Sequence, residues 1–329
     1  MMSIYCPVIY GNGAYVLHEK LSQKIKNYEI FSISPYAALC PKLMSIYKKE
    51  NCIIHSSPDL GPYILSNKSI NILTFHGFRI DREFIDFSSV AQKFYYKNIL
   101  APAIVSAVKN ADILTGVSHF IADLAKNTLN IKKDIHVIEN GVDHNKFIPV
   151  KEKKPADEKI KILYVGAFKK AKGFHLIEMI SDKLPKNTQI IMIGSDKHGD
   201  KKEGKISWLG RVLHEDMPFV YQDCDILLFP TFREGFGLVV AEAMACGLPV
   251  VTSNKSTMPE LIHHGKGGYL TDFGDVDAMS MYLKKLIENP SLRADMGAYN
   301  RERILQQYTE EKMMIGYNEL FSLSKDLSS

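Results

Sequence analysis

Short apolar runs recur along the whole chain and are separated by longer amphipathic stretches. Residues 118–129 and 275–288 are two such stretches, with the pattern of half-buried helices. Strands that are apolar on both faces need helices on both sides, so the alternation predicts parallel sheets covered by helices, the α/β fold class. Seven runs are predicted to be strands: residues 70–75, 112–117, 135–138, 160–166, 188–194, 225–230 and 248–253.

The alternation is interrupted at residues 149–159. This stretch, PVKEKKPADEK, holds two prolines and seven charged residues and has almost nothing to bury. The chain has 329 residues, more than the ~250–300 at which single cores stop growing, so two domains are expected. We therefore interpret the stretch as a linker between α/β domains at 1–150 and 151–307. After them, residues 309–323 are predicted to form a helix with Thr309 as its N-cap.

Composition narrows the classes of function. The chain has 41 basic and 37 acidic residues, a net charge of +4, and no run of five basic residues, which argues against nucleic acid as a partner. Five cysteines without C-x-x-C spacing argue against zinc and disulfides and fit a reducing cytosol. No stretch reaches the ~18 apolar residues of a membrane helix, and no signal-peptide pattern is present. We therefore expect a cytoplasmic protein whose membrane contact, where it has one, is peripheral.

The most hydrophobic stretch, EGFGLVVAEAMACGLPVV at residues 234–251, contains two glutamates, Glu234 and Glu242. Neither is followed by a lysine or arginine within four positions. Glu234 lies in the loop after the predicted strand 225–230, and Glu242 lies in the helix that follows. Ligands of open α/β sheets bind beyond the carboxyl ends of the strands, so both carboxylates are candidates for ligand contacts. The alternative is structural, with one glutamate helping to cap the helix and the other reaching the surface.

Two glycines in this stretch favour the close approach of a ligand. Gly235 and Gly237 leave the backbone open, and amides at a helix N-terminus suit a polar or anionic group. The spacing is not a dinucleotide fingerprint, because Val240 stands at the third glycine position. Gly11 and Gly13 fail the same test, and a plain tight turn explains them equally well.

Together with several further segments, this stretch resembles the retaining GT-B glycosyltransferases of family 4, the glycosyl transferases group 1. The resemblance covers roughly residues 111–305, whereas the first hundred residues match only in pattern. It implies two doubly wound, Rossmann-like domains that face a cleft, with a C-terminal helix at 308–329 packing back on the first domain. The further segments are ADILTGVSHFIADLAKNTLNIKKDIHVIENGVDHNKFIP, ILYVGAFKKAKGFHLI, ISWLGRVLHEDMPFVYQDCDILLFPTFREGFG and MPELIHHGKGGYL.

The resemblance implies transfer of a hexose from a UDP-, GDP- or ADP-sugar to a hydroxyl of a glycan or lipid-linked acceptor, with the anomeric configuration retained. Such enzymes serve cell-surface polysaccharide, lipopolysaccharide or glycolipid synthesis. The implied catalytic residues are Glu234 and His76 at the donor sugar and Lys172 at its phosphates. Glu242 is implied at the ribose, and both glutamates are expected to meet sugar hydroxyls and not cations. The other implied donor-site residues are Lys169, Lys170, Arg211, Gly235, Phe236, Gly237, Leu238, Gly11 and Gly13.

One departure from the family pattern concerns the phosphates. The family often has an arginine directly after the glycine of YVG, and here Ala167 stands there. Lys169 and Lys170 are close enough to supply the missing charge, and we expect Lys169 to do so. The departure favours an alternative, a non-catalytic GT-B protein that binds or scaffolds another glycosyltransferase. A sugar phosphorylase with pyridoxal phosphate fits less well, since it would be much longer and no segment resembles its cofactor lysine.

Two Asp-x-Asp pairs have the spacing of a divalent-metal site. Asp223 and Asp225 lead into a buried strand, and Asp275 and Asp277 start a helix for which Asp275 is a natural N-cap. We therefore expect no metal at either pair. The resemblance implies that lysine and helix dipoles take the metal's place, and no other cofactor is expected.

Residues 91–111, AQKFYYKNILAPAIVSAVKNA, mix lysine with aromatic side chains. This composition fits a helix that rests on the inner face of a membrane, near a lipid-linked acceptor. The favoured alternative is an ordinary helix packed on the sheet. The acceptor itself cannot be predicted, because specificity in such enzymes lies in the first domain, where the resemblance is weakest.

Overall fold

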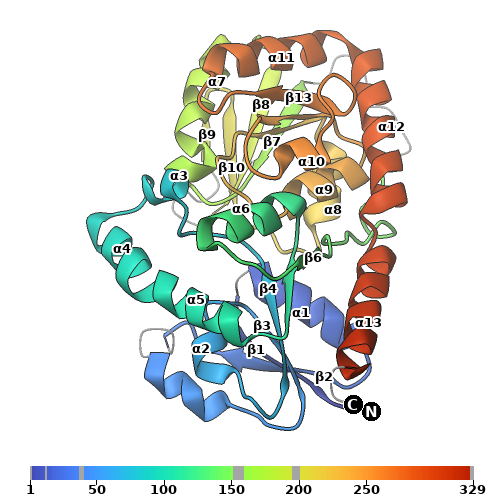
Figure 1. Cartoon of the computed structure of the whole chain (residues 1–329). Helices are drawn as coiled ribbons and strands as arrows, with labels where there is room; N and C mark the ends of the chain where they lie inside the picture. Colours follow the sequence, from blue (N-terminus) through green and yellow to red (C-terminus); the bar gives the residue numbers. More distant parts are fainter. Residues whose placement is uncertain (1, 12, 37–40, 151–158, 195–200, 327–329) are drawn as a thin grey trace. The chain divides into compact units, whose positions relative to one another are not determined.

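The chain forms two compact units. The computed structural model describes all residues apart from 1, 12, 37–40, 151–158, 195–200 and 327–329 (Figure 1). Unit 1 is Met1–Asn140 with Glu311–Ser329, and unit 2 is Gly141–Glu310. Most of the predicted linker at 149–159 lies outside the described residues.

Unit 1 is built on a sheet of six parallel strands. They are β1 (Ile4–Ile9), β2 (Tyr28–Ile33), β3 (Ile53–Ser56), β4 (Ile70–Phe75), β5 (Ile113–Gly116) and β6 (Ile135–Val137). Their order is β2-β1-β3-β4-β5-β6, with Ile4 of β1 in register with Tyr28 on one side and Ile53 on the other. The strands predicted at 70–75, 112–117 and 135–138 are confirmed to within one residue at each end.

Helices flank this sheet and bury their apolar sides (Figure 1). β4 is buried at all six positions, as expected for a strand covered on both faces. The predicted helix at 118–129 is confirmed as α6, with the Ser118 side chain accepting a hydrogen bond from the amide of Ile121 at 3.2 Å. The helical elements are α1 (Gly13–Lys24), η2 (Pro41–Tyr47), α2 (Gly61–Ile64), α3 (Arg82–Ile85), α4 (Val90–Tyr95), η3 (Tyr96–Leu100), α5 (Ala101–Asn110), α6 (His119–Leu129) and α13 (Glu310–Asp326).

The last helix, α13, belongs mostly to unit 1, although unit 2 separates it from the rest of that unit in the sequence. The ring centroids of Tyr317 and Phe321 lie 5.5 Å and 5.4 Å from that of His55 in β3. Phe321 also lies 5.9 Å from Tyr28 in β2. Tyr317 is fully buried, so α13 covers part of the sheet of unit 1.

Unit 2 contains a sheet of seven strands. They are β7 (Ile160–Val165), β8 (Thr188–Ile193), β9 (Lys201–Glu203), β10 (Ile206–Gly210), β11 (Ile226–Phe229), β12 (Val250–Ser253) and β13 (Gly268–Thr271). The order is β13-β12-β11-β7-β8-β10-β9, and only β9 is antiparallel to its neighbour among the described strands. The strands predicted at 160–166, 188–194, 225–230 and 248–253 are confirmed to within two residues at each end.

The strand order of unit 2 reverses between β7 and β11. β8 and β10 follow on one side of β7, whereas β11, β12 and β13 follow on the other. This is the doubly wound order in which ligands bind at the reversal point, beyond the carboxyl ends of the strands. The loops after β7 and β11 are therefore the place to look for a site.

The helices of unit 2 follow the same alternation with its strands (Figure 1). α9 lies within the stretch 234–251 and carries Glu242, and six of its eight residues are buried. The helix predicted at 275–288 is confirmed as α11, whose N-cap Asp275 accepts a hydrogen bond from the amide of Ala278 at 2.9 Å. The helical elements are η4 (Lys170–Lys172), η5 (Phe174–Leu176), α7 (Ile177–Lys183), α8 (Met217–Asp223), α9 (Leu238–Ala245), α10 (Met258–Leu261), α11 (Val276–Glu288) and α12 (Pro290–Gln307).

Candidate functional site

The loops after β7 and β11 are locked together at the reversal point of unit 2. The amide of Phe232 donates to the carbonyl of Ala171 at 2.8 Å. Gly173 has φ +66°, and a Cβ at this position would overlap the carbonyl oxygen of Pro230. Only glycine allows the two loops to approach this closely. Their contact brings Lys172 of the first loop to Glu234 of the second.

Lys172 and Glu234 form an ion pair between Nζ and Oε1. Nζ also donates to the carbonyl of Arg233 at 3.1 Å, and the Thr231 hydroxyl donates to Oε1 of Glu234 at 3.3 Å. The side chains of Lys172 and Glu234 are 26% and 18% exposed, so solvent reaches the pair. The expectation that Glu234 lacks a cationic partner is therefore wrong. The two residues are 62 positions apart, but the strands before them are neighbours in the sheet.

The backbone around Glu234 is held by Ser256. Its hydroxyl donates to the Glu234 carbonyl at 2.7 Å and accepts from the Glu234 amide at 2.9 Å. Gly237 has φ +100°, and a Cβ there would lie 2.7 Å from the methyl carbon of Met258, so this position requires glycine. The Phe236 side chain is buried against Tyr308, at 5.7 Å between ring centroids, and can offer a ligand only its backbone. Gly235 and Leu238 are partly exposed beside it.

Glu242 is 8% exposed and already has a protein partner at each carboxylate oxygen. Oε1 lies 3.1 Å from Nε2 of His214, and Oε2 accepts from the Tyr221 hydroxyl at 2.9 Å. Burial and the Glu242 carboxylate raise the pKa of Tyr221 well above its ordinary value, so it remains a donor. Sequence reasoning missed both partners, which lie 28 and 21 positions before Glu242 in the chain.

The other cations predicted in unit 2 are exposed. Lys169 and Lys170 lie in the loop after β7, close to Ala167, and Arg211 follows β10. Within the described parts of the chain, no ion pair involves these three side chains. The structure thus brings Lys172 to Glu234 but does not join the other predicted cations to the pair. Their roles stay predictions.

The site residues predicted in unit 1 also lie at carboxyl ends of strands. His76 follows β4 and is partly buried, with its Nε2 atom 3.1 Å from Nε2 of His18 in α1. Burial lowers the pKa of His76 to about 4, so the ring is neutral at pH 7. Gly11 and Gly13 follow β1, and a Cβ at either would meet nothing within 4 Å. Gly11 has φ +79°, which explains glycine there by conformation and not by packing.

Both Asp-x-Asp pairs are engaged by the protein. Lys161 forms an ion pair with Asp223 at 2.8 Å and donates its amide to Asp225 at 2.8 Å. Asp275 caps α11, and Asp277 pairs with Lys183 at 2.8 Å. Among the described residues no cluster of three histidine, cysteine or acidic side chains could hold a metal ion.

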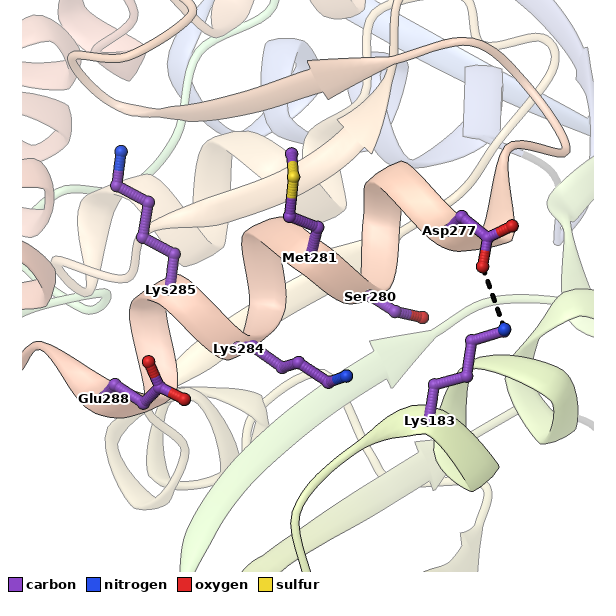
Figure 2. A pocket seen from close by; sticks show the side chains of 7 residues that line it. All are labelled: Lys183, Asp277, Ser280, Met281, Lys284, Lys285 and Glu288. Carbon is purple, nitrogen blue, oxygen red and sulfur yellow. Dashed lines mark ion pairs between the residues drawn. The ribbon is translucent and has the colours of Figure 1, made fainter.

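A surface pocket lies between α7 and α11 (Figure 2). The Lys183–Asp277 ion pair bridges the two helices at one end of it. None of the predicted site residues lines it. The pocket is formed by Lys183, Asp277, Ser280, Met281, Lys284, Lys285 and Glu288.

Comparison with known sequences identifies relatives over most of the chain. The family model for glycosyl transferases group 1 matches residues 146–303. An uncharacterised glycosyltransferase of Methanocaldococcus jannaschii is 30% identical over 378 residues, covering 99% of this chain and 98% of that protein. A capsular polysaccharide biosynthesis glycosyltransferase of Staphylococcus aureus is 24% identical over 310 residues, covering 86% of this chain and 80% of its own.

Solved structures with the same fold have low sequence identity. Sucrose-phosphate synthase from Thermosynechococcus elongatus has a TM-score of 0.85 at 18% identity, with both chains covered completely. HepE from Anabaena, in complex with UDP and glucose, has a TM-score of 0.76 at 17% identity and covers 98% of this chain and 100% of its own. These likenesses identify the fold, and the relative at 30% identity identifies the family. The chain therefore belongs to the glycosyl transferases group 1, is a glycosyltransferase and has the α/β fold of the GT-B type.

Proposed function

We propose that the protein is a retaining, metal-independent glycosyltransferase that moves a hexose from a nucleoside-diphosphate sugar to an acceptor hydroxyl. The observation that carries this proposal is the Lys172–Glu234 pair at the reversal point of the unit 2 sheet. A sugar nucleotide needs a cation for its phosphates and an acceptor for its sugar hydroxyls at adjacent positions. The pair supplies one of each.

Lys172 keeps bonding capacity for a phosphate. An ammonium group has three N–H donors, and two acceptors reach Nζ from the described residues, the Glu234 carboxylate and the Arg233 carbonyl. The third N–H points to no protein acceptor there and can bind a phosphate oxygen. Charge that develops on the leaving diphosphate would then be stabilised by a lysine already held in place.

Glu234 accepts from sugar hydroxyls in the proposed complex. Lys172 and Thr231 both bind its Oε1 atom, so Oε2 keeps its lone pairs for the hexose. No protein nucleophile is required if the leaving phosphate takes the acceptor proton on the same face of the sugar. The protein then contributes mainly by electrostatic stabilisation and orientation.

Glu242 binds the ribose in this proposal. Each of its oxygens has one protein donor and can accept a second hydrogen bond from a ribose hydroxyl. His214 is 54% exposed at its side chain, so the ribose can approach from its side or displace it. Arg211 is proposed to lie toward the base, and Gly11, Gly13 and His76 are proposed as further donor contacts.

Lys169 is proposed to replace the arginine that is missing at Ala167. It is exposed in the same loop as Lys172, where phosphate oxygens are expected. Lys169, Lys170 and Lys172 should be replaced by alanine singly, and donor KM and turnover measured. We expect Lys169→Ala, or failing that Lys170→Ala, to lose a large share of what Lys172→Ala loses. Near-normal kinetics of both single variants would contradict the replacement.

The donor and the acceptor are proposed from relatives. HepE was solved with UDP and glucose, which supports UDP-sugars as the first donors to test, before GDP- and ADP-sugars. The relative from S. aureus acts in capsular polysaccharide biosynthesis, which supports a glycan or lipid-linked acceptor of the cell surface. A panel of these donors should be screened for ligand-induced thermal stabilisation, where a ligand at ~100 times its Kd adds ~2.7 kcal/mol.

The decisive experiment follows the anomeric configuration by NMR. A donor selected in the thermal screen is incubated with the protein and an acceptor, or with water alone. Retention predicts that an α-linked donor gives an α-configured product. A β-configured product would contradict the retaining mechanism. Absence of both transfer and hydrolysis with every donor would favour the second candidate, a non-catalytic scaffold, which the alanine at position 167 supports.

We also propose peripheral contact with the inner face of the membrane. Val90 and Phe94 of α4 and Ile99 of η3 are 85%, 66% and 45% exposed. Lys93 and Lys97 lie on the same segment and would meet anionic lipid headgroups.

By contrast α5 buries Ile104, Ala107 and Val108, as the packed-helix alternative requires. Co-sedimentation with anionic vesicles should therefore fall in Phe94→Ser, and unchanged binding would contradict the contact. Among the described helices, none is long and apolar enough to cross a bilayer.

A further inference from the structure

His76 is one end of a chain of hydrogen bonds inside unit 1. Its Nε2 atom lies 3.1 Å from Nε2 of His18 in α1. The other ring nitrogen of His18, Nδ1, lies 2.6 Å from the hydroxyl of Tyr28 in β2. His18 and Tyr28 are 0% and 6% exposed. Solvent therefore reaches these hydrogen-bonded groups mainly at the His76 end.

The chain continues across the sheet. The Tyr28 hydroxyl lies 2.7 Å from Nδ1 of His55 in β3. Nε2 of His55 lies 2.7 Å from the hydroxyl of Thr74 in β4, which lies 2.6 Å from the hydroxyl of Thr115 in β5. His55, Thr74 and Thr115 are all 0% exposed. Five hydrogen bonds thus join α1 and four strands to the residue that follows β4.

The side chains of this hydrogen-bond network are uncharged. Burial and the neighbouring imidazoles lower the pKa of His18 well below its ordinary value, and lower that of His55 to about 3. Two further titratable groups face the chain, Cys6 from β1 and Tyr317 from α13, and burial raises the pKa of both. The network therefore consists of neutral donors and acceptors at pH 7.

Counting hydrogens fixes the direction of the bonds. Each neutral group has one polar hydrogen to donate. Among the described residues, the Thr115 hydroxyl has one hydrogen-bond partner, the hydroxyl of Thr74. The Thr115 hydrogen is therefore satisfied only when it is donated to Thr74. The Thr74 hydrogen must then go to Nε2 of His55, which places the His55 proton on Nδ1.

The same reasoning runs on to the exposed end. Nδ1–H of His55 donates to the Tyr28 oxygen, and the Tyr28 hydrogen donates to Nδ1 of His18. The His18 proton is then on Nε2 and donates to Nε2 of His76. The proton of His76 remains for Nδ1. The reverse arrangement leaves the Thr115 hydrogen without an acceptor, and giving the Tyr28 hydrogen to Sγ of Cys6 replaces an imidazole acceptor by a weak one, so both cost free energy.

The geometry points to His76 as an imidazole protonated on Nδ1, which meets its ligand as a hydrogen-bond donor and not as a base. Among the described residues no hydrogen bond reaches this Nδ1 atom, so the N–H is available to an oxygen atom of a ligand. The identity of that ligand, an oxygen-rich sugar nucleotide, rests on the proposed function. The positioning residues that fix this tautomer are His18, Tyr28, His55, Thr74 and Thr115.

The tautomer can be measured without any substrate. In the full chain labelled with 15N-histidine, the NMR shifts of the two ring nitrogens distinguish Nδ1–H from Nε2–H. The His76 signals are assigned by their loss in His76→Asn. We expect the Nδ1–H tautomer in the wild type at pH 7. The Nε2–H tautomer would overturn the inference.

Tyr28→Phe tests whether the hydrogen-bond network determines the tautomer of His76. The variant keeps the ring but removes the hydroxyl that joins His18 to His55, so His76 is expected to become a mixture of tautomers. Tyr5→Phe is the matched control, because Tyr5 is also buried in this sheet, in β1, and among the described residues no hydrogen bond joins its hydroxyl to the network. An unchanged His76 signal in Tyr28→Phe would overturn the positioning role. If that variant does not fold, Thr74→Val interrupts the hydrogen-bond network just beyond His55 and carries the same expectation.

Activity separates a donor from a base at position 76. Asparagine keeps an N–H near the place of Nδ1 but cannot accept a proton at pH 7. We expect transfer by His76→Asn within roughly tenfold of wild type, and by His76→Ala roughly 10²–10³ lower, the usual cost of deleting a donor. Equal loss in the two variants would overturn the donor role. If the wild type transfers from no sugar nucleotide, the proposed function fails, while the NMR result still decides the tautomer.

Discussion

In unit 1 the polar groups beside β4 are uncharged and almost entirely buried, whereas in unit 2 those beside β7 and β11 form an ion pair that solvent reaches. Burying a charge costs much free energy, so polar side chains inside a sheet covered on both faces are neutral and hydrogen-bonded to one another. Neutral groups can orient a ligand through directional hydrogen bonds, but they supply no charge. The exposed pair at Lys172 and Glu234 offers charge, which is what a diphosphate requires.

The largest expected effect is the loss of unit 1 in acid. The pKa values of His55 and His76, about 3 and about 4, lie below the ordinary 6.5 of the unfolded chain. Between these values the unfolded chain binds more protons, so stability is complete above about pH 6.5 and falls as the pH drops toward 4. Each histidine contributes up to ~1.4 kcal/mol per pH unit, and His18 acts in the same direction.

Hydrogen exchange of the amides of β4 and β11 at pH 7 and pH 5 measures this difference. After correction for intrinsic rates, β4 should lose more protection than β11, which serves as the internal control. Equal losses of protection in β4 and β11 would contradict the greater acid sensitivity of unit 1.

Glu234→Gln tests the charged member of the comparison. Glutamine keeps the shape but loses the charge beside Lys172, so transfer should fall roughly two orders of magnitude, a cost of ~2.7–4 kcal/mol, while nucleotide binding survives. Glu242→Ala should instead weaken nucleotide binding, because it removes the proposed ribose contact. Turnover and nucleoside diphosphate affinity are measured for both, with exposed Glu178→Gln as control. Small and equal effects of the first two variants would disprove the separate roles.

Gly173→Ala tests the loop contact that creates the pair. Gly173 and Gly204 have similar φ values, +66° and +60°, but a Cβ at Gly204 would meet nothing within 4 Å. Alanine at either position would therefore have similar backbone strain, and only Gly173→Ala adds an overlap with Pro230. We expect its free energy of unfolding to fall by roughly 1–3 kcal/mol more than that of Gly204→Ala. Equal denaturant midpoints would show that the loops separate freely.

No effect is expected from chelation. The Asp-x-Asp pairs are occupied by Lys161, Lys183 and the cap of α11, and the proposed phosphate charge comes from lysine. Transfer should therefore persist in excess EDTA. Complete loss of activity that Mg2+ or Mn2+ restores would identify a metal site and make the lysine explanation unnecessary.

Sequence patterns predicted the fold where strands are continuous apolar runs. INILTF at 70–75 coincides with β4, which is central and fully buried. The pattern missed β1, which contains Pro7, and β2, an edge strand with exposed polar positions. It also missed β9 and β13, the two edge strands of the unit 2 sheet, and the internal strands β3 and β10. Apolar periodicity reports burial on both faces and is weak at sheet edges.

The candidate site was predicted in its residues but not in its contacts. Glu234, Glu242 and Lys172 stand out by motif, yet the ion pair depends on which strands are neighbours, and a search of four following positions cannot detect it. His18 and His55 were missed because a histidine within an apolar segment resembles any packed core residue. The available signal was three histidines beside apolar elements, at VLH, IIH and TFH.

The rings of α13 that cover His55 have a consequence for biosynthesis. The ribosome makes residues 311–326 only after all of unit 2, so the nascent first unit waits for its cover while a contiguous second unit, Gly141–Glu310, is already complete. Until Tyr317 and Phe321 are synthesised, the imidazole of His55 that they cover is accessible to water. Vectorial synthesis therefore favours folding of the second unit before the first is closed, the reverse of the usual order from the N-terminus.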